Sequence, residues 1–168
     1  MNRRAFLLLS LYVPFAALAA QPGKVQNLDD ALRWLDAMNA NGTAKMSGAW
    51  PLTAVLDHLA QSIEMSMDGY PESKSALFQG TAGAAAFAYF KWRGRMSHDL
   101  AAPIPGAAPL AKGDWQAPAL RLRAAIKRFE AHSGVLKPHF AYGDLSKADY
   151  AIAHTLHIAN HQDEISTA

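Results

Sequence analysis

The sequence predicts an all-α protein, a bundle of four main helices with one short extra helical element. Apolar residues recur at the spacing of a buried helix face, as they do in Leu52, Val55, Leu56, Leu59 and Ile63. Capping residues, glycines and prolines mark the ends of these segments. No apolar–polar alternation typical of a strand and no hairpin sequence competes with a helical interpretation.

The composition indicates a folded domain without disulfides. Of the 168 residues, 51% are hydrophobic and 18% are charged, which excludes a disordered chain. The length suits one domain, and we expect it over residues 20–168. The chain contains no cysteine. This excludes disulfides, a cysteine-anchored lipoprotein, a cysteine zinc site and a thiol nucleophile.

Residues 1–19 have the three parts of a signal peptide. A basic start precedes an apolar run over residues 5–17, and Ala17-Leu18-Ala19 provides the small residues that a peptidase requires. The pair Arg3-Arg4 with the residues after it is similar to a twin-arginine signal, and an ordinary Sec start is the alternative. We therefore expect an exported protein, periplasmic or extracellular, with no stable membrane insertion after cleavage.

Loss of this segment makes the protein electrically neutral. The chain has 16 Lys and Arg against 14 Asp and Glu. Two of the 16 are Arg3 and Arg4, so 14 basic residues remain against 14 acidic ones. No basic stripe interleaved with aromatic residues appears, and we expect no binding of nucleic acid. A small-molecule substrate and a homodimer are both compatible with the sequence.

The first three helices are predicted from their boundaries. The first begins after the capping residue Asn27 and ends near residues 41–42. The second has Pro51 at its first position and ends at residues 69–71. The third covers residues 75–97, and two glycines near its start, Gly80 and Gly83, make it regular only after them.

Two more helices are predicted beyond a proline-rich connection. Residues 102–109 contain three prolines and are expected to form an extended surface connection. A fourth helix covers residues 118–132, and residues 139–145 form a loop. The last helix is capped by Ser146, with Asp149 placed as in a capping box.

Three histidines share one face of this last helix. At 100° per residue, Tyr150, His154, His157 and His161 fall within an arc of about 60°. His157 and His161 are four residues apart, so their imidazoles can converge on one ion from adjacent turns. Two ligands do not form a tight site, and a third must come from another helix.

His58 is the candidate for the third ligand because it lies within an otherwise apolar helix. Three histidines with an open fourth position are typical of a catalytic metal centre. The sequence does not distinguish Zn, Ni, Fe or Mn as the divalent ion. The structural alternative is a hydrogen-bonded His58 and a solvated pair of histidines on the last helix.

The remaining polar candidates have weaker signals. His98 and His132 are expected to interact with helix ends, where the helix dipole favours a positive charge. His139 is a candidate for the mouth of the site. Asp57, Glu64 and Glu164 are expected on the polar faces of their helices, and one of them could fix the tautomer of a ligating imidazole.

The chain resembles the DinB/YfiT-like superfamily of metal-dependent proteins, and within it a branch of unknown function. The similarity lies in Trp50-Pro51-Leu52 leading into Leu56-Asp57-His58-Leu59-Ala60, in the segment from Pro103 to Ala107, and in Pro138-His139-Phe140 before the final helix. It covers residues 28–165. The resemblance implies a four-helix bundle and a metal triad of His58, His157 and His161, with His154 outside it, either behind the ligands or exposed.

The resemblance leaves the reaction open. The superfamily includes thiol-dependent transferases and isomerases, but a ligand set alone does not name a reaction. A metal-dependent hydrolase or thiol transferase, a non-enzymatic metal- or ligand-binding bundle of the cell envelope, and an interaction domain with incidental histidines are the three hypotheses. The sequence after the last histidine, Gln162-Asp163-Glu164, departs from the usual pattern of the superfamily.

Overall fold

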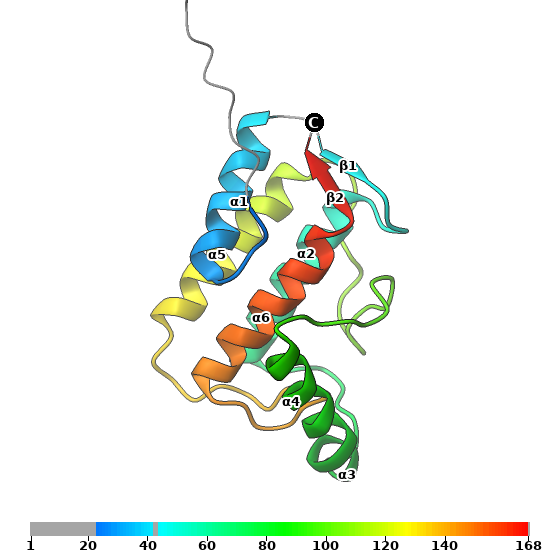
Figure 1. Ribbon diagram of the computed structural model, residues 1–168, viewed down its shortest axis with the longest axis vertical. Helices are drawn as coiled ribbons and strands as arrows, with labels where there is room; N and C mark the ends of the chain where they lie inside the picture. The colour runs from blue at the N-terminus through cyan, green and yellow to red at the C-terminus, as the bar shows by residue number, and fades with distance from the viewer. Residues whose placement is uncertain (1–22, 42–43, 168) are drawn as a thin grey trace, which may run out of the picture.

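The computed structural model describes residues 23–41 and 44–167, so the predicted signal peptide lies outside the described residues. The described chain is an all-α bundle with one small ribbon of two strands (Figure 1). Its elements are α1 (Leu28–Asn41), β1 (Ala44–Met46), α2 (Leu52–Asp68), α3 (Ala76–Phe78), the π-helical turn η1 (Gln79–Gly83), α4 (Ala84–Arg93), α5 (Gln116–Ala131), α6 (Lys147–Gln162) and β2 (Ile165–Thr167).

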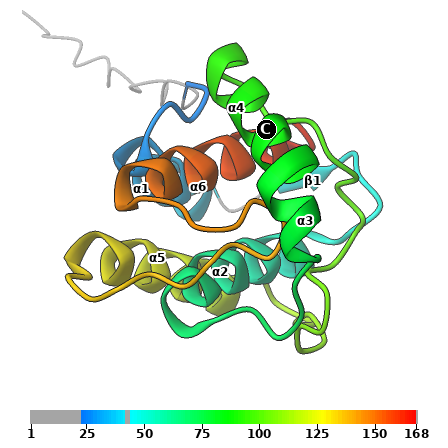
Figure 2. The same ribbon diagram turned by 90° about the horizontal axis from the view of Figure 1, so that it is seen from below.

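The bundle consists of two layers of paired helices. Figure 2 shows α1 beside α6 in one layer and α2 beside α5 in the other. The core between them takes buried side chains from all four, among them Trp34 of α1, Ile63 of α2, Phe129 of α5 and Ile158 of α6. The predicted all-α bundle is confirmed.

α2 is the central helix, and its polar residues are buried together with its apolar ones. Side chains are buried on all its faces from Leu52 to Ile63, as in a helix enclosed by the rest of a protein. Asp57, His58 and Gln61 are among the buried residues. Because a buried polar group is stable only with a partner, these three residues must contact something specific.

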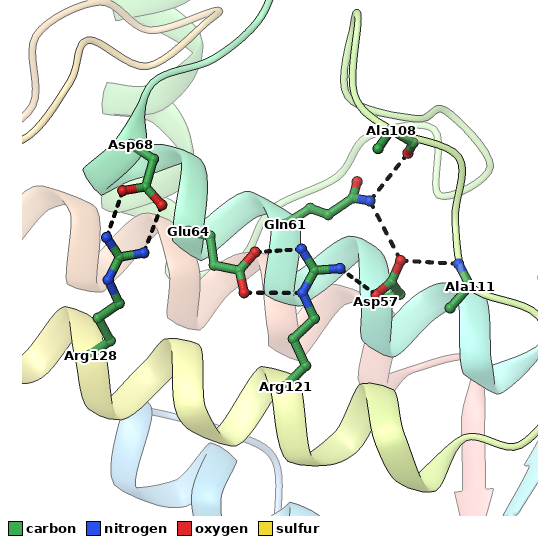
Figure 3. A network of polar contacts seen from close by, with 8 residues as sticks. All are labelled: Asp57, Gln61, Glu64, Asp68, Ala108, Ala111, Arg121 and Arg128. Carbon is green, nitrogen blue, oxygen red and sulfur yellow. Dashed lines mark hydrogen bonds and ion pairs between the residues drawn. The ribbon is translucent and has the colours of Figure 1, made fainter.

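Two of these polar residues hold the connection between α4 and α5 against the bundle (Figure 3). The Asp57 carboxylate accepts hydrogen bonds from the guanidinium of Arg121 on α5 (2.7 Å) and from the backbone N–H of Ala111 (3.0 Å). Gln61 donates to the backbone carbonyl of Ala108 (3.2 Å). The connection, residues 94–115, is therefore anchored near its end, although it contains no helix or strand.

The segment α3–η1–α4 projects from the side of the bundle (Figures 1 and 2). Its regular α-helix begins only after Gly83, as predicted, but ends at Arg93, four residues before the expected end. Gly94 there adopts φ +67°, a left-handed conformation that favours glycine. His98 thus lies beyond the helix, and the expectation that it interacts with the end of this helix is wrong.

The β1–β2 ribbon was not expected from the sequence. The two three-residue strands pair antiparallel, with Lys45 opposite Ser166, and Ser47 donates its N–H to the carbonyl of Glu164. Strands this short contain too few residues to show an alternating pattern. The ribbon joins the end of α6 to the segment that precedes α2. No helix in the described part of the chain is both long and apolar enough to cross a membrane.

Candidate metal centre

Four histidine side chains meet between α2, α6 and the connection of residues 94–115. His58 comes from α2, His157 and His161 from α6, and His98 from the connection. One ring nitrogen of each lies within 4.8 Å of the corresponding nitrogens of the other three. The four histidines are thus within reach of one another and could hold a metal ion.

The distance between two of these rings already matches metal coordination. The Nε2 atoms of His58 and His157 lie 3.2 Å apart. Nitrogen ligands ~2.0–2.1 Å from a tetrahedral zinc ion lie ~3.3 Å from one another. The same distance also suits an N–H···N hydrogen bond between two neutral rings, so the spacing alone does not identify the occupant.

The antiparallel packing of α2 and α6 brings these residues together. The contact between Ser66 and His154 and that between His58 and His157 connect the same two helices at different levels. The spacing of four residues places His161 one turn beyond His157. Trp50, just before α2, covers this end of the site. Its ring lies edge-on to His58 and nearly parallel to His161, with centroids 5.2 and 6.4 Å away.

Burial keeps the clustered imidazoles neutral. His58 is 3% exposed and His161 is 0% exposed. Desolvation, with a smaller contribution from His98, lowers the pKa of His58 to about 4. Desolvation and the neighbouring histidines lower the pKa of His161 to about 3 and that of His157 well below its usual value. Neutral imidazole is the form that binds metals, so all three rings are in the ligand state at neutral pH.

Unpaired buried nitrogen atoms support a metal ligand at this place. Within the described residues, both ring nitrogens of His161 are buried without a hydrogen-bond partner. Such atoms are uncommon in folded proteins and call for an explanation. The carboxylate of Glu164 lies 3.5 Å from Nδ1 of His161, where it faces the ring but makes no close contact. Coordination of an ion would give His161 the partner that it lacks.

The chemistry of the four side chains selects a class of metal. Imidazole nitrogen suits zinc, nickel, copper and iron, whereas magnesium and calcium prefer oxygen ligands. The group contains four imidazoles and no carboxylate. The residues therefore fit a divalent transition metal or zinc better than an alkaline-earth ion.

His154 and His139 lie outside the group of four. Nε2 of His154 is 3.2 Å from Oγ of Ser66, and its ring packs edge-on against Phe129. Nδ1 of His139 accepts hydrogen bonds from the backbone N–H groups of Ala141 and Tyr142, at 3.1 and 3.2 Å. Both rings thus have partners of their own.

A cavity of about 350 Å³ adjoins three of the four clustered histidines. His58, His98 and His157 line it on the side of the cluster, and His139 and His154 contribute to its other walls. Apolar side chains complete much of the lining, and the charged residues there are Lys74 and Asp99. The cavity makes the cluster accessible to a small molecule.

His98 is the member of the cluster that the sequence did not identify as a candidate. It lies in an irregular segment, so no periodicity relates it to the other histidines. Its place depends on the path of the connection, which is set by contacts with α2. A sequence pattern that describes one helix at a time contains no signal for this contact.

The comparisons with known proteins identify a family but no characterised relative. No curated protein and no solved structure matches the chain. A family model described as "Protein of unknown function (DUF1569)" matches residues 21–168. The match covers nearly the whole chain after the predicted signal peptide, and the protein belongs to this family of unknown function.

Proposed function

We propose that this protein is an exported divalent-metal-binding protein of the DinB-like superfamily, with His58, His157 and His161 as ligands. The observation that carries the proposal is the convergence of these neutral rings, in which both nitrogens of the fully buried His161 have no hydrogen-bond partner among the described residues. The resemblance of the sequence to that superfamily supports the same three ligands.

The adjoining cavity favours a metal-dependent enzyme, a hydrolase or a thiol transferase acting on a small molecule. A bound ion would supply a Lewis acid that polarises the substrate. The walls formed by Met96, Ile104 and Phe140 would exclude water from the substrate. His139 and His154, kept neutral by burial, which lowers the pKa of each to about 3, would shape the cavity without adding charge.

A non-enzymatic metal- or ligand-binding bundle of the cell envelope is the second candidate. The observation that favours it is the fourth imidazole, His98, within reach of the other three. Four protein ligands make a closed site of the structural kind, whereas a catalytic zinc site keeps one position open. The two candidates therefore differ in whether His98 stays bound to the metal or leaves one position open for a substrate.

Zinc binding tests the proposal directly. Mature protein freed of metal with EDTA is titrated calorimetrically with Zn²⁺, and its melting temperature is measured with and without the ion. We expect one ion per chain and a stabilisation of about 2.7 kcal/mol at a free zinc concentration 100 times the dissociation constant. His157→Ala should lose the zinc-dependent shift.

His132→Ala is the matched control, because His132 lies outside the four-histidine group and should leave zinc binding unchanged. If the unaltered protein binds no zinc at micromolar concentrations, and its melting temperature is the same with and without the ion, the proposed metal site is wrong. Export is tested separately by the mass of the secreted chain, which should begin at Ala20 if the predicted signal peptide is removed.

A further inference from the structure

His98 is held beside the other histidines by a connection that is fixed at several points. Met96 and Ile104, on either side of it, are 6% and 5% exposed. Further along, the hydroxyl of Thr53 donates to the carbonyl of Gly113 (2.5 Å), and α2 makes the contacts with residues 108 and 111 described above. The location of His98 is thus determined by packing against the bundle.

The ring of His98 is oriented by a neighbour on α6. Its Nδ1 lies 3.0 Å from the side-chain amide of Asn160. The ring packs edge-on against His157 and His161, with centroids 5.0 and 5.6 Å away. An asparagine can present its oxygen instead of its nitrogen after rotation of the amide. With the oxygen toward Nδ1, Asn160 would accept a hydrogen bond from the Nδ1–H group and leave the lone pair on Nε2 for a metal.

His98 differs from the other three histidines in exposure and support. His58 and His161 are buried and, like His157, lie on rigid helices. His98 lies on the connection and is exposed as a whole residue. Its ring is still partly removed from water, and this desolvation lowers its pKa. It also lines the 350 Å³ cavity. Displacement of His98 alone would therefore open the metal toward the cavity and leave the other ligands in place.

We propose that His98 is the fourth metal ligand and an exchangeable one, which a small molecule in the cavity replaces. The inference rests on the proposed metal site. The replacing ligand has one donor atom, such as an imidazole nitrogen or a thiolate, and an apolar body that contacts Met96, Ile104 and Phe140. The site thus alternates between a closed form with four protein ligands and an open form with three.

Cobalt substitution measures the number and kind of ligands without any knowledge of the reaction. The metal-free mature protein is loaded with Co²⁺, whose visible absorption is strong in tetrahedral sites and weak when more ligands are bound. We expect a tetrahedral spectrum in the unaltered protein. His98→Ala should weaken Co²⁺ binding by about 10-fold or more and change the spectrum, and added imidazole should restore the original one.

Exchange is tested with 4-phenylimidazole, which combines a nitrogen donor with an apolar body. It should bind the Co²⁺ form of the unaltered protein by displacing His98, and it should bind His98→Ala about 10-fold more tightly because no protein ligand competes. His132→Ala is the control and should behave as the unaltered protein does. The melting temperatures of the metal-free proteins check that each variant is folded.

The outcomes separate the inference from the proposed function. If His98→Ala binds Co²⁺ with the affinity and spectrum of the unaltered protein while His157→Ala does not bind it, His98 is not a ligand and the three-histidine site stands. If 4-phenylimidazole binds both proteins equally, His98 is not exchangeable. If the unaltered protein binds no Co²⁺, the inference and the proposed function are both wrong.

Discussion

His139 is built into the structure as a neutral ring. Its Nδ1 accepts hydrogen bonds from two backbone N–H groups, and its ring stacks on Tyr142 at a centroid distance of 4.2 Å. Burial lowers its pKa to about 3. Protonation of Nδ1 would remove the acceptor that both amides use, so the folded protein resists protonation at this residue.

This arrangement predicts an acid-dependent loss of stability. The unfolded chain has a histidine pKa of about 6.5, and it takes up a proton at a pH at which folded His139 does not. The contribution of His139 to the free energy of unfolding is therefore constant above pH 6.5. As the pH falls from 6.5 toward 3, it lowers the free energy of unfolding by up to ~1.4 kcal/mol per pH unit. Urea unfolding of the metal-free protein between pH 7 and pH 4 measures the combined slope of His139 and the other buried histidines, whose pKa values are also lowered.

His139→Asn is the informative variant, because its side-chain oxygen can accept the same amides but does not titrate. We expect its free energy of unfolding to depend less steeply on pH than that of the unaltered protein. The difference should correspond to at most one fewer proton taken up on unfolding. Equal slopes in the two proteins would show that His139 is not the residue responsible.

Gly83 permits a close contact between η1 and the loop of residues 139–145. A Cβ atom on Gly83 would lie 1.9 Å from the backbone carbonyl oxygen of Ala141. Gly83→Ala should therefore destabilise the fold by about 1–3 kcal/mol, despite the better helix propensity of alanine. Gly80→Ala is the control, since nothing lies within 4 Å of its Cβ, and it should be neutral or stabilising by ~0.5–1 kcal/mol. Thermal unfolding of both variants checks the contrast, and equal effects would contradict it.

At the scale of elements, helices were predictable where short-range signals define them. Asn27 accepts the N–H of Asp30 and Ser146 accepts the N–H of Asp149, as their sequences indicated. Pro51 precedes α2 by one residue and is not its first residue. Each of these boundaries depends on residues within a few positions, and so it is visible in the sequence.

The elements that were missed depend on distant partners. β1 is a strand only because β2, about 120 residues later, pairs with it. His98 reaches the cluster only because α2 holds the connection that carries it. The histidines of α6 were found from their helical spacing, and His58 from its place in an apolar helix. The site was therefore predictable to the extent that its residues lie on regular elements.

The ion pairs between α2 and α5 provide a matched comparison of buried and exposed charge (Figure 3). Arg121 bridges Asp57 and Glu64, while Arg128 pairs with Asp68. The side chain of Asp57 is 6% exposed and that of Asp68 is 54% exposed. The two aspartates thus make similar pairs in very different surroundings.

Asp57→Ala should lower the free energy of unfolding by about 1–3 kcal/mol, because it removes a buried carboxylate that accepts hydrogen bonds from Arg121 and from the backbone N–H of Ala111. Asp68→Ala should have a much smaller effect, since exposed pairs contribute little. Because Asp57 also anchors Ala111, its loss should weaken metal binding through His98. Urea unfolding and zinc titration of both variants measure these effects. Similar stability losses in the two variants would contradict the comparison.

At the scale of the whole molecule, the site connects parts of the chain that are far apart in sequence. His58 and His157 are separated by 99 residues, and the sequence has no cysteine with which to make a covalent link. The four-helix core is formed by packing between two layers, and the histidine cluster spans both of them because α2 and α6 belong to different layers (Figure 2).

An ion held by both helices would act as a reversible cross-link in a protein without disulfides. Closing a loop of ~100 residues restricts the unfolded chain, by ~4.7 kcal/mol in the chain-entropy estimate for a disulfide, and less for an ion that can dissociate. Zinc should therefore slow proteolysis that proceeds through unfolding. Pulse proteolysis with and without EDTA should show this in the unaltered protein and not in His157→Ala. The lifetime of the protein would then follow the supply of metal.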